Sequence, residues 1–157
     1  LISLSIYALS HTLSTYQDAK RSVRINNVID SLHIPNGYYV DAQNIFGEKR
    51  EFEPGRTEAS RISGGHDDTP VNTYKELTDH IVAAGFKPAG SAFENSPTEE
   101  RFFQNEDGVW IRLNVQSAKY RDRGLYGVRK GEPLTDEDTT TAPSYFTLWV
   151  NLDDNNE

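Results

Sequence analysis

The first 35 residues carry a helical pattern of hydrophobic positions. One apolar stripe advances in steps of three or four residues and consists of Ile2, Ile6, Leu9, Leu13 and Tyr16. A second stripe, shifted in phase, consists of Val23, Ile25, Val28, Ile29 and Leu32. Pro35 and Gly37 end the pattern, because both residue types interrupt helices. We therefore predict a long N-terminal helix, which would measure roughly 50 Å at 1.5 Å per residue.

Alternating hydrophobic and polar residues predict strands in the rest of the chain. Residues 109–116 alternate, with hydrophobic side chains at Val109, Ile111, Leu113 and Val115. The same alternation recurs near the C-terminus at Phe146, Leu148, Val150 and Leu152. Residues 37–43 are rich in strand formers, and a strand that ends near Phe103 is joined to residues 109–116 by a turn at residues 105–108.

One shorter helix is predicted between these strands. Thr73 and Glu76 match a capping box, and Gly85 is placed to adopt the left-handed conformation that ends helices. The buried stripe of this helix is expected to consist of Tyr74, Leu77, Ile81 and Ala84. Residues 46–70 and 117–143 are polar and punctuated by Gly and Pro, so we predict two long loops there.

The order of these elements predicts an α+β fold. We expect an antiparallel sheet of about four strands with one packed helix, preceded by the long N-terminal helix. Residues 1–35 would form that N-terminal helix or stalk, and residues 36–157 a single α+β domain. A long leading helix before an antiparallel sheet is similar in outline to type IV pilins and pseudopilins. The resemblance is architectural, and it implies a subunit displayed at a cell surface.

Two interpretations of the N-terminal helix stay open. Its first fifteen residues lack charge but include several Ser and Thr, which makes them too polar for a membrane span of about 20 apolar residues. The helix would either pack on the domain or a second copy of it, or form the outer part of a helix whose upstream residues, before Leu1, cross a membrane. The second interpretation predicts an anchored, extracytoplasmic protein, whereas a cytoplasmic location is the alternative.

Composition and motifs argue against several classes of function. The formal net charge of −8 disfavours nucleic acid as a partner, since both would be negatively charged. The chain has no Cys, which removes disulfides, thiolate nucleophiles and thiolate metal sites. No phosphate-binding loop, dinucleotide fingerprint or nucleophile elbow is present. We therefore predict no catalytic residues, no metal site and no cofactor.

Two groups of residues are candidates for binding. The first lies on the non-core side of the two alternating strands and consists of Trp110, Arg112, Tyr145 and Trp149. These rings would either contact a partner or be covered by the N-terminal helix or the 117–143 loop as a second small core. The second group is a basic loop with Lys119, Arg121, Arg123, Arg129 and Lys130. It would either bind an anionic partner or remain a solvated loop.

These observations favour a non-catalytic extracytoplasmic domain, anchored to a membrane, that binds a protein or a glycan. One alternative is a cytosolic acidic protein of the immunity type, which would mask a basic partner. Another alternative is a small hydrolase that uses His66 with Asp67 or Asp68, because imidazole and carboxylate groups support acid–base chemistry.

Overall fold

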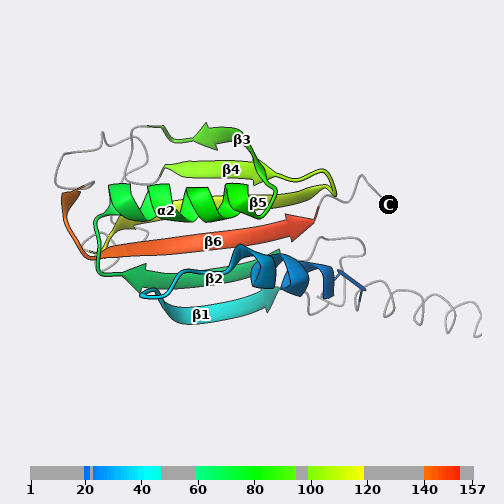
Figure 1. Ribbon diagram of the computed structural model, residues 1–157, viewed down its shortest axis with the longest axis horizontal. Coiled ribbons are helices and arrows are strands. Elements are labelled where there is room, and N and C mark those ends of the chain that lie inside the picture. Colours follow the sequence, from blue (N-terminus) through cyan, green and yellow to red (C-terminus); the bar gives the residue numbers. More distant parts are fainter. Residues whose placement is uncertain (1–19, 22, 47–58, 95–98, 119–139, 153–157) are drawn as a thin grey trace, which may run out of the picture.

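A computed structural model of the chain describes residues 20–21, 23–46, 59–94, 99–118 and 140–152. These residues form one antiparallel sheet of six strands and two helices (Figure 1). The strands are β1 (Tyr39–Phe46), β2 (Ala59–His66), β3 (Lys87–Ala92), β4 (Glu100–Gln104), β5 (Val109–Ser117) and β6 (Ser144–Leu152). Their order across the sheet is β1-β2-β6-β5-β4-β3, so β6 is inserted at the centre between β2 and β5.

The predicted α+β class is confirmed, but the prediction of about four strands is wrong. β2 lies inside residues 46–70, which were predicted to be a loop, and β3 was not predicted at all. In β2 the positions that share a face with the core are Ser60, Ile62 and Gly64, so only one of them carries a large hydrophobic side chain. Almost all of β3 is exposed at the sheet edge. Neither strand therefore shows the alternation from which strands are predicted.

β2 has small residues because its neighbours leave no room for larger ones. A Cβ atom added at Gly64 would lie 2.0 Å from the backbone oxygen of Tyr39 on β1 and 3.0 Å from the Phe146 ring on β6. The Phe146 side chain is fully buried and fills the space above Gly64. A glycine in the middle of β2 is thus required by its two flanking strands, although it weakens the strand pattern in the sequence.

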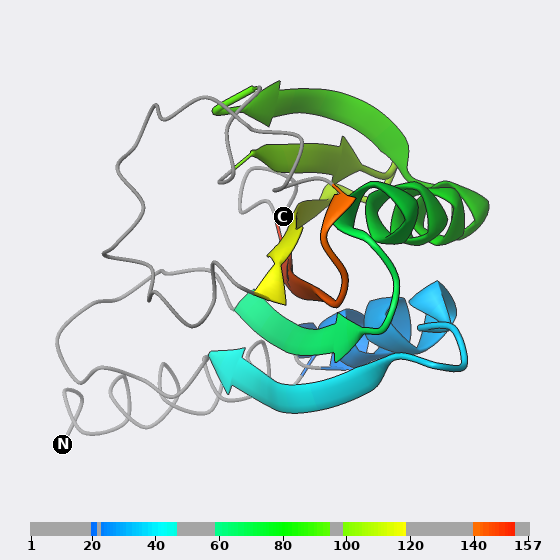
Figure 2. The same ribbon diagram turned by 90° about the vertical axis from the view of Figure 1, so that its left-hand side faces the viewer.

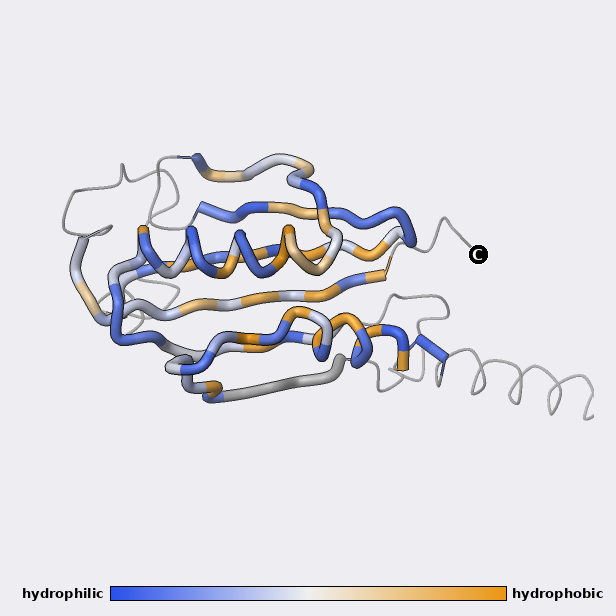
Figure 3. Tube along the Cα trace, in the orientation of Figure 1, coloured by the Kyte–Doolittle hydropathy of each residue, from blue (hydrophilic) through white to orange (hydrophobic). Residues whose placement is uncertain are grey.

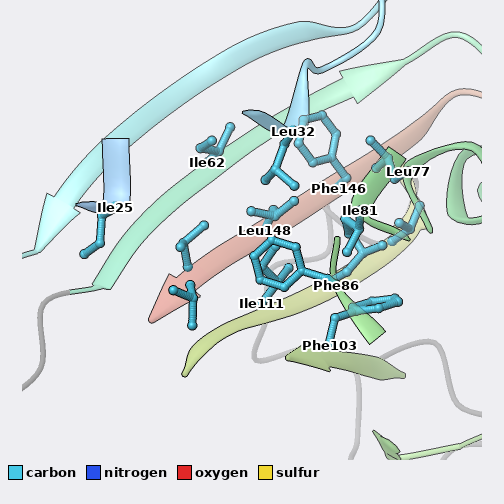
Figure 4. Close-up of a cluster of buried hydrophobic side chains, with 14 of the residues drawn as sticks. Ile25, Leu32, Ile62, Leu77, Ile81, Phe86, Phe103, Ile111, Phe146 and Leu148 are labelled. Atoms are coloured by element: carbon cyan, nitrogen blue, oxygen red, sulfur yellow. The ribbon is translucent and has the colours of Figure 1, made fainter. Parts of the chain in front are cut away.

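The alternation predicted for β5 and β6 is confirmed. Val109 pairs with Leu152 and Ser117 with Ser144, so the two strands are in register over their whole length. Every second residue of β5 is buried, and the hydrophobic positions of β6 are buried as well. Figure 3 shows hydrophobic positions recurring along both central strands. Their apolar side chains form the floor of the hydrophobic core (Figure 4).

Both helices lie on the same face of the sheet, as the view along the strands in Figure 2 shows. Helix α2 (Pro70–Ala83) contacts β5 and β6, and the helix at residues 23–32 lies along β1 and β2 (Figure 1). From the latter helix, Ile25 and Leu32 are buried in the core, whereas Val23 is 58% exposed. The apolar stripe that packs is therefore Ile25 to Leu32, without Val23.

The rest of the predicted N-terminal helix lies outside the described residues. Residues 1–19 and 22 belong to that part, so the full length of the helix and the membrane interpretation of its first half stay predictions. Within the part of the chain that the structure describes, no helix combines the length and the hydrophobicity that crossing a membrane requires.

Helix α2 begins four residues earlier than the capping box predicted. The N-cap is Thr69, whose side chain accepts a hydrogen bond from the Asn72 backbone N–H at 3.4 Å, and Pro70 occupies the first helical position. Asp68 supports this cap, since its Oδ1 atom accepts hydrogen bonds from the backbone of Thr69 and the side chain of Asn72. The cap predicted at Thr73 is wrong because Thr73 already lies inside the helix, where its backbone N–H donates to the Thr69 carbonyl at 2.9 Å, and its side chain is buried.

The predicted end of α2 and the predicted hairpin are confirmed. Gly85 has a φ angle of +93°, and the backbone N–H of Phe86 reaches back to the carbonyl of Ile81 at 3.3 Å, as in a Schellman motif. In the turn between β4 and β5, the Asn105 side chain accepts backbone hydrogen bonds from Asp107 and Val109. Local side-chain chemistry therefore determines both of these chain reversals.

Replacing Gly64 with alanine should destabilise the fold strongly. The new methyl group would collide with the Tyr39 carbonyl and push β1 away from β2, so we expect a loss of about 3 kcal/mol or more in the free energy of unfolding. Chemical denaturation measures this change. In the control Gly85→Ala, no atom lies within 4 Å of the added methyl group and only the left-handed backbone is strained. That control should cost about 1 kcal/mol, and equal losses in the two variants would contradict the steric argument.

Candidate functional site

The face of the sheet opposite the two helices carries the candidate binding residues. We call this surface the polar face, and it comprises the side chains of β2, β4, β5 and β6 that alternate with the core positions. The register places on it Arg61 and Ser63 of β2, Tyr145, Thr147, Trp149 and Asn151 of β6, Trp110, Arg112, Asn114 and Gln116 of β5, and Glu100, Phe102 and Gln104 of β4. Most of these side chains are partly exposed.

A row of alternating guanidinium groups and aromatic rings crosses the polar face. Arg61, Trp149, Arg112 and Phe102 pair in sequence across β2, β6, β5 and β4, and we call them the arginine–tryptophan row. The central carbon of the Arg112 guanidinium lies 3.9 Å from the centroid of the Trp149 ring. The corresponding atom of Arg61 lies 5.7 Å from the same ring. Trp149 is therefore contacted by a cation from each neighbouring strand.

Both arginines contact the Trp149 ring, and their hydrogen bonding is incomplete. The Nε atoms of Arg61 and Arg112 are buried and have no hydrogen-bond partner. Glu100 approaches Nη1 of Arg112 at 3.7 Å, and the Arg112 side chain is 36% exposed. A cation–π contact contributes about 0.5–1 kcal/mol at an exposed site and more when water is excluded. The row thus positions two positive charges on the polar face.

A shallow depression of about 490 Å³ lies beside this row. It is lined by Phe102, Trp110, Ile111, Arg112 and Asn151. Trp110 pairs with Asn151 of β6, one step along the sheet from the pair formed by Arg112 and Trp149. The depression therefore combines two aromatic walls with one cationic and one amide side chain, a composition typical of small-ligand sites.

The structure brings three of the four predicted residues of this surface together. Trp110, Arg112 and Trp149 lie on adjacent strands of one face, whereas Tyr145 pairs with Gln116 at the far end of β6. Tyr145 is four residues from Trp149, or about 13 Å along a strand. The described part of the N-terminal helix packs on the opposite face and does not cover the tryptophans. The second candidate group, Lys119 to Lys130, lies outside the described residues.

Two residues of the site were missed by the analysis of the sequence. Arg61 belongs to β2, which was predicted to be loop, so its position opposite Trp149 could not be anticipated. Phe102 was placed near the end of a strand, but neither of the adjacent residues Phe102 and Phe103 was assigned to a face. Phe103 is buried in the core and Phe102 is on the polar face. Because Arg112 was already assigned to that face, pairing it with Phe102 would have been sufficient to identify Phe102.

A second polar cluster surrounds His66 at one end of the sheet. Nδ1 of His66 lies 3.2 Å from Thr73 Oγ1, which lies 2.7 Å from Ser144 Oγ. Ser144 in turn donates to the backbone carbonyl of His66 at 3.3 Å. Since each hydroxyl has one proton, this chain is satisfied when Nδ1 of His66 carries a hydrogen and donates to Thr73. Thr73 and Ser144 are both fully buried, so the cluster ties α2 to β2 and β6.

Tyr38 and Glu76 complete this cluster. The Tyr38 ring stacks on the His66 ring with centroids 4.1 Å apart, and its hydroxyl donates to the Glu76 carboxylate at 2.8 Å. Burial, together with this hydrogen bond to a carboxylate and the carboxylate's negative charge, raises the pKa of Tyr38 well above its usual value. Thr73 and Glu76, the residues of the predicted capping box, therefore bind to the His66 cluster instead.

Among the described residues, no hydrogen bond joins His66 to Asp67 or Asp68, the carboxylates with which a hydrolase would use it. Asp68 uses Oδ1 to cap α2, and these hydrogen bonds lower the pKa of its carboxyl group. The described residues also contain no cluster of three His, Asp or Glu that could hold a metal ion. The His66 cluster thus has the contacts of a structural junction.

Comparisons with known proteins add no information about family or function. No family model, no curated protein and no solved structure matches this chain. The function is therefore argued from the two clusters described above.

Tyr38→Phe should make stability less sensitive to alkaline pH. Above about pH 10 an unfolded tyrosine ionises, whereas folded Tyr38 keeps its proton because its pKa is raised, so the unfolded state gains stability as pH rises. At pH 7 the variant should be less stable by about 1 kcal/mol through the lost hydrogen bond, and the difference should shrink by pH 11. Urea denaturation across this range measures the effect, and parallel profiles would contradict it.

Proposed function

We propose that this chain is a non-catalytic binding domain that contacts a protein or glycan partner through its polar face. The observation that carries the proposal is the arginine–tryptophan row, in which Trp149 is in cation–π contact with Arg112 at 3.9 Å and Arg61 at 5.7 Å, beside an open depression. Tryptophan and arginine are the residues most enriched at the energetic centres of interfaces. A sheet face that only needed to be soluble would not require two tryptophans and two stacked arginines.

The surroundings of the row also favour recognition by side chains. β5 and β6 are interior strands whose backbone hydrogen bonds are taken by their neighbours, so a partner cannot extend the sheet at this place. What remains for contact is a set of planar surfaces with polar edges, namely Trp110, Phe102, Arg112 and Asn151. Such amphipathic groups suit a partner that offers both apolar surface and hydrogen-bond acceptors.

The two alternatives from the sequence receive less support. A hydrolase would need His66 beside an accessible nucleophile, but the hydroxyls nearest to its ring and backbone belong to the fully buried Thr73 and Ser144. An immunity-type protein that masks a basic partner would need an acidic contact surface. On the polar face of β2, β4, β5 and β6, the described charged residues are Arg61, Arg112 and Glu100, so this surface is locally positive.

The double variant Trp110→Ala/Trp149→Ala tests the proposal. We expect the wild-type chain to be retained on an array of neutral and acidic oligosaccharides and peptides, and the variant to lose at least about tenfold in affinity. The free energy of unfolding should fall by only about 1–2 kcal/mol, because both rings lie outside the core. Surface plasmon resonance with the retained ligand and chemical denaturation provide the two measurements.

Lys75→Ala is the matched control for this experiment. Lys75 is on the exposed side of α2, where it pairs with Asp79 and is remote from the polar face. This control should bind like the wild type. Equal binding by the double variant, accompanied by a loss of stability, would mean that the tryptophans form a second small core and would contradict the proposal.

We also propose that the domain acts outside the cytoplasm, held to a membrane by its N-terminal helix. The support is the uncharged stretch of residues 1–15, which is too polar to span a membrane itself but would suit the outer part of a helix that crosses one. The full-length protein should sediment with membranes, and protease added to intact cells should cleave the domain. Recovery in the cytoplasmic fraction, protected from protease, would contradict this location. A pilin-like assembly stays a prediction.

A further inference from the structure

We infer that the depression beside the arginine–tryptophan row binds a sugar residue that carries a carboxylate, as part of an acidic glycan. The inference rests on the proposed function, because it assigns a ligand class to the same face. Its basis is the juxtaposition of two aromatic side chains, Phe102 and Trp110, with the partly exposed guanidinium of Arg112 and the amide of Asn151.

The depression is large enough for a six-membered sugar ring, and its lining offers aromatic and polar contacts. Arg112 and Phe102 pair with each other in one row, and Trp110 and Asn151 pair in the next, two residues further along β5. Two residues correspond to about 7 Å along a strand, so the two rows are neighbours, and the depression of about 490 Å³ beside them has room for a sugar ring. The apolar face of a sugar can stack on Trp110 or Phe102, while its hydroxyl groups reach Asn151.

The charge on this face selects for a carboxylate. Among the described residues of the polar face, Arg61 and Arg112 outnumber Glu100, whose carboxylate lies 3.7 Å from Nη1 of Arg112. A carboxylate on the ring could accept hydrogen bonds from the exposed part of the Arg112 guanidinium, which matches a carboxylate in planar geometry. The net charge of −8 opposes a dense polyanion, so isolated carboxylates on a glycan fit better than a chain of phosphates or sulfates.

A glycan fits this site better than an acidic peptide does. A peptide in extended form gains much of its affinity by adding to a free strand edge, and the depression lies on β4 and β5, both paired on each side. A helical peptide would need a long apolar groove, whereas the described lining offers only two aromatic side chains and a part of Ile111. Recognition here must rely on a short set of side chains around one ring.

The decisive experiment compares methyl β-glucuronide with methyl β-glucoside. The two sugars differ only at C6, which carries a carboxylate in the first and a hydroxymethyl group in the second. The ¹⁵N-labelled protein is titrated with each sugar by NMR, following the indole N–H signals of Trp110 and Trp149. We expect both indole signals to shift with the glucuronide, and the glucoside to bind about tenfold more weakly because it cannot pair with Arg112. The advantage of the glucuronide should shrink when the salt concentration is raised.

Two variants test the assigned roles. Arg112→Gln should abolish the preference for the glucuronide while leaving residual binding of both sugars, and Trp110→Ala should abolish binding of both. Arg101→Gln is the matched control, because Arg101 lies on β4, next to Phe102, but faces the helices. Its guanidinium lies 4.2 Å from the Tyr74 ring and forms an ion pair with Glu99. It should keep the wild-type preference. The remaining amide signals of each variant report whether it is folded.

The outcomes separate this inference from the proposed function. Two results would contradict the assignment of a carboxylated sugar while leaving the binding role of the polar face intact. One is equal affinity for the two sugars, and the other is a Glu-rich hexapeptide that shifts the same indole signals at lower concentration. If the glucuronide does not bind but the double tryptophan variant still loses binding to the array ligand, the carboxylated sugar is likewise excluded and the binding role of the polar face stands. If no ligand on the array is retained and neither sugar shifts the indoles, both proposals fail.

Discussion

The register between β5 and β6 is the constraint on which both faces of the sheet depend. With Leu113 opposite Leu148, the aliphatic residues of the two strands and Phe146 point toward the helices, whereas Trp110 and Trp149 lie on the other face. The same register sets Arg112 opposite Trp149 on the other face. A shift of one residue would bring polar side chains into the core and separate the guanidinium from the ring. Core packing therefore also determines the geometry of the candidate site.

The polar face combines stability and recognition in the same contacts. Stacking on Trp149 restricts the two arginine side chains, which would otherwise lose considerable conformational entropy when they bind a ligand. The Arg112 side chain remains 36% exposed although the Glu100 carboxylate lies 3.7 Å from its Nη1 atom. A surface of this kind is organised before a partner arrives, although its rings and charges are not buried in the core.

The second polar cluster shows how a buried network can resemble a catalytic one. His66, Thr73 and Ser144 form a closed chain of hydrogen bonds that joins the starts of α2 and β6 to the end of β2. Each hydroxyl needs a partner because an unpaired buried polar group is costly. The stacked Tyr38 extends the cluster toward β1. These contacts hold together the end of the sheet that lies away from the β4–β5 hairpin.

The sequence by itself determined the elements with strong periodicity: the central strands β5 and β6, the hairpin turn at Asn105 and the glycine end of α2. It placed Trp110, Arg112 and Trp149 on one face, because the side-chain period of a strand is two. Only the tertiary structure decided the rest. β2 is recognisable as a strand only beside its neighbours, since Phe146 fills the space over Gly64 and thereby removes the hydrophobic signal from the local sequence. Arg61 consequently joins the site through pairing between distant strands, which no local pattern encodes.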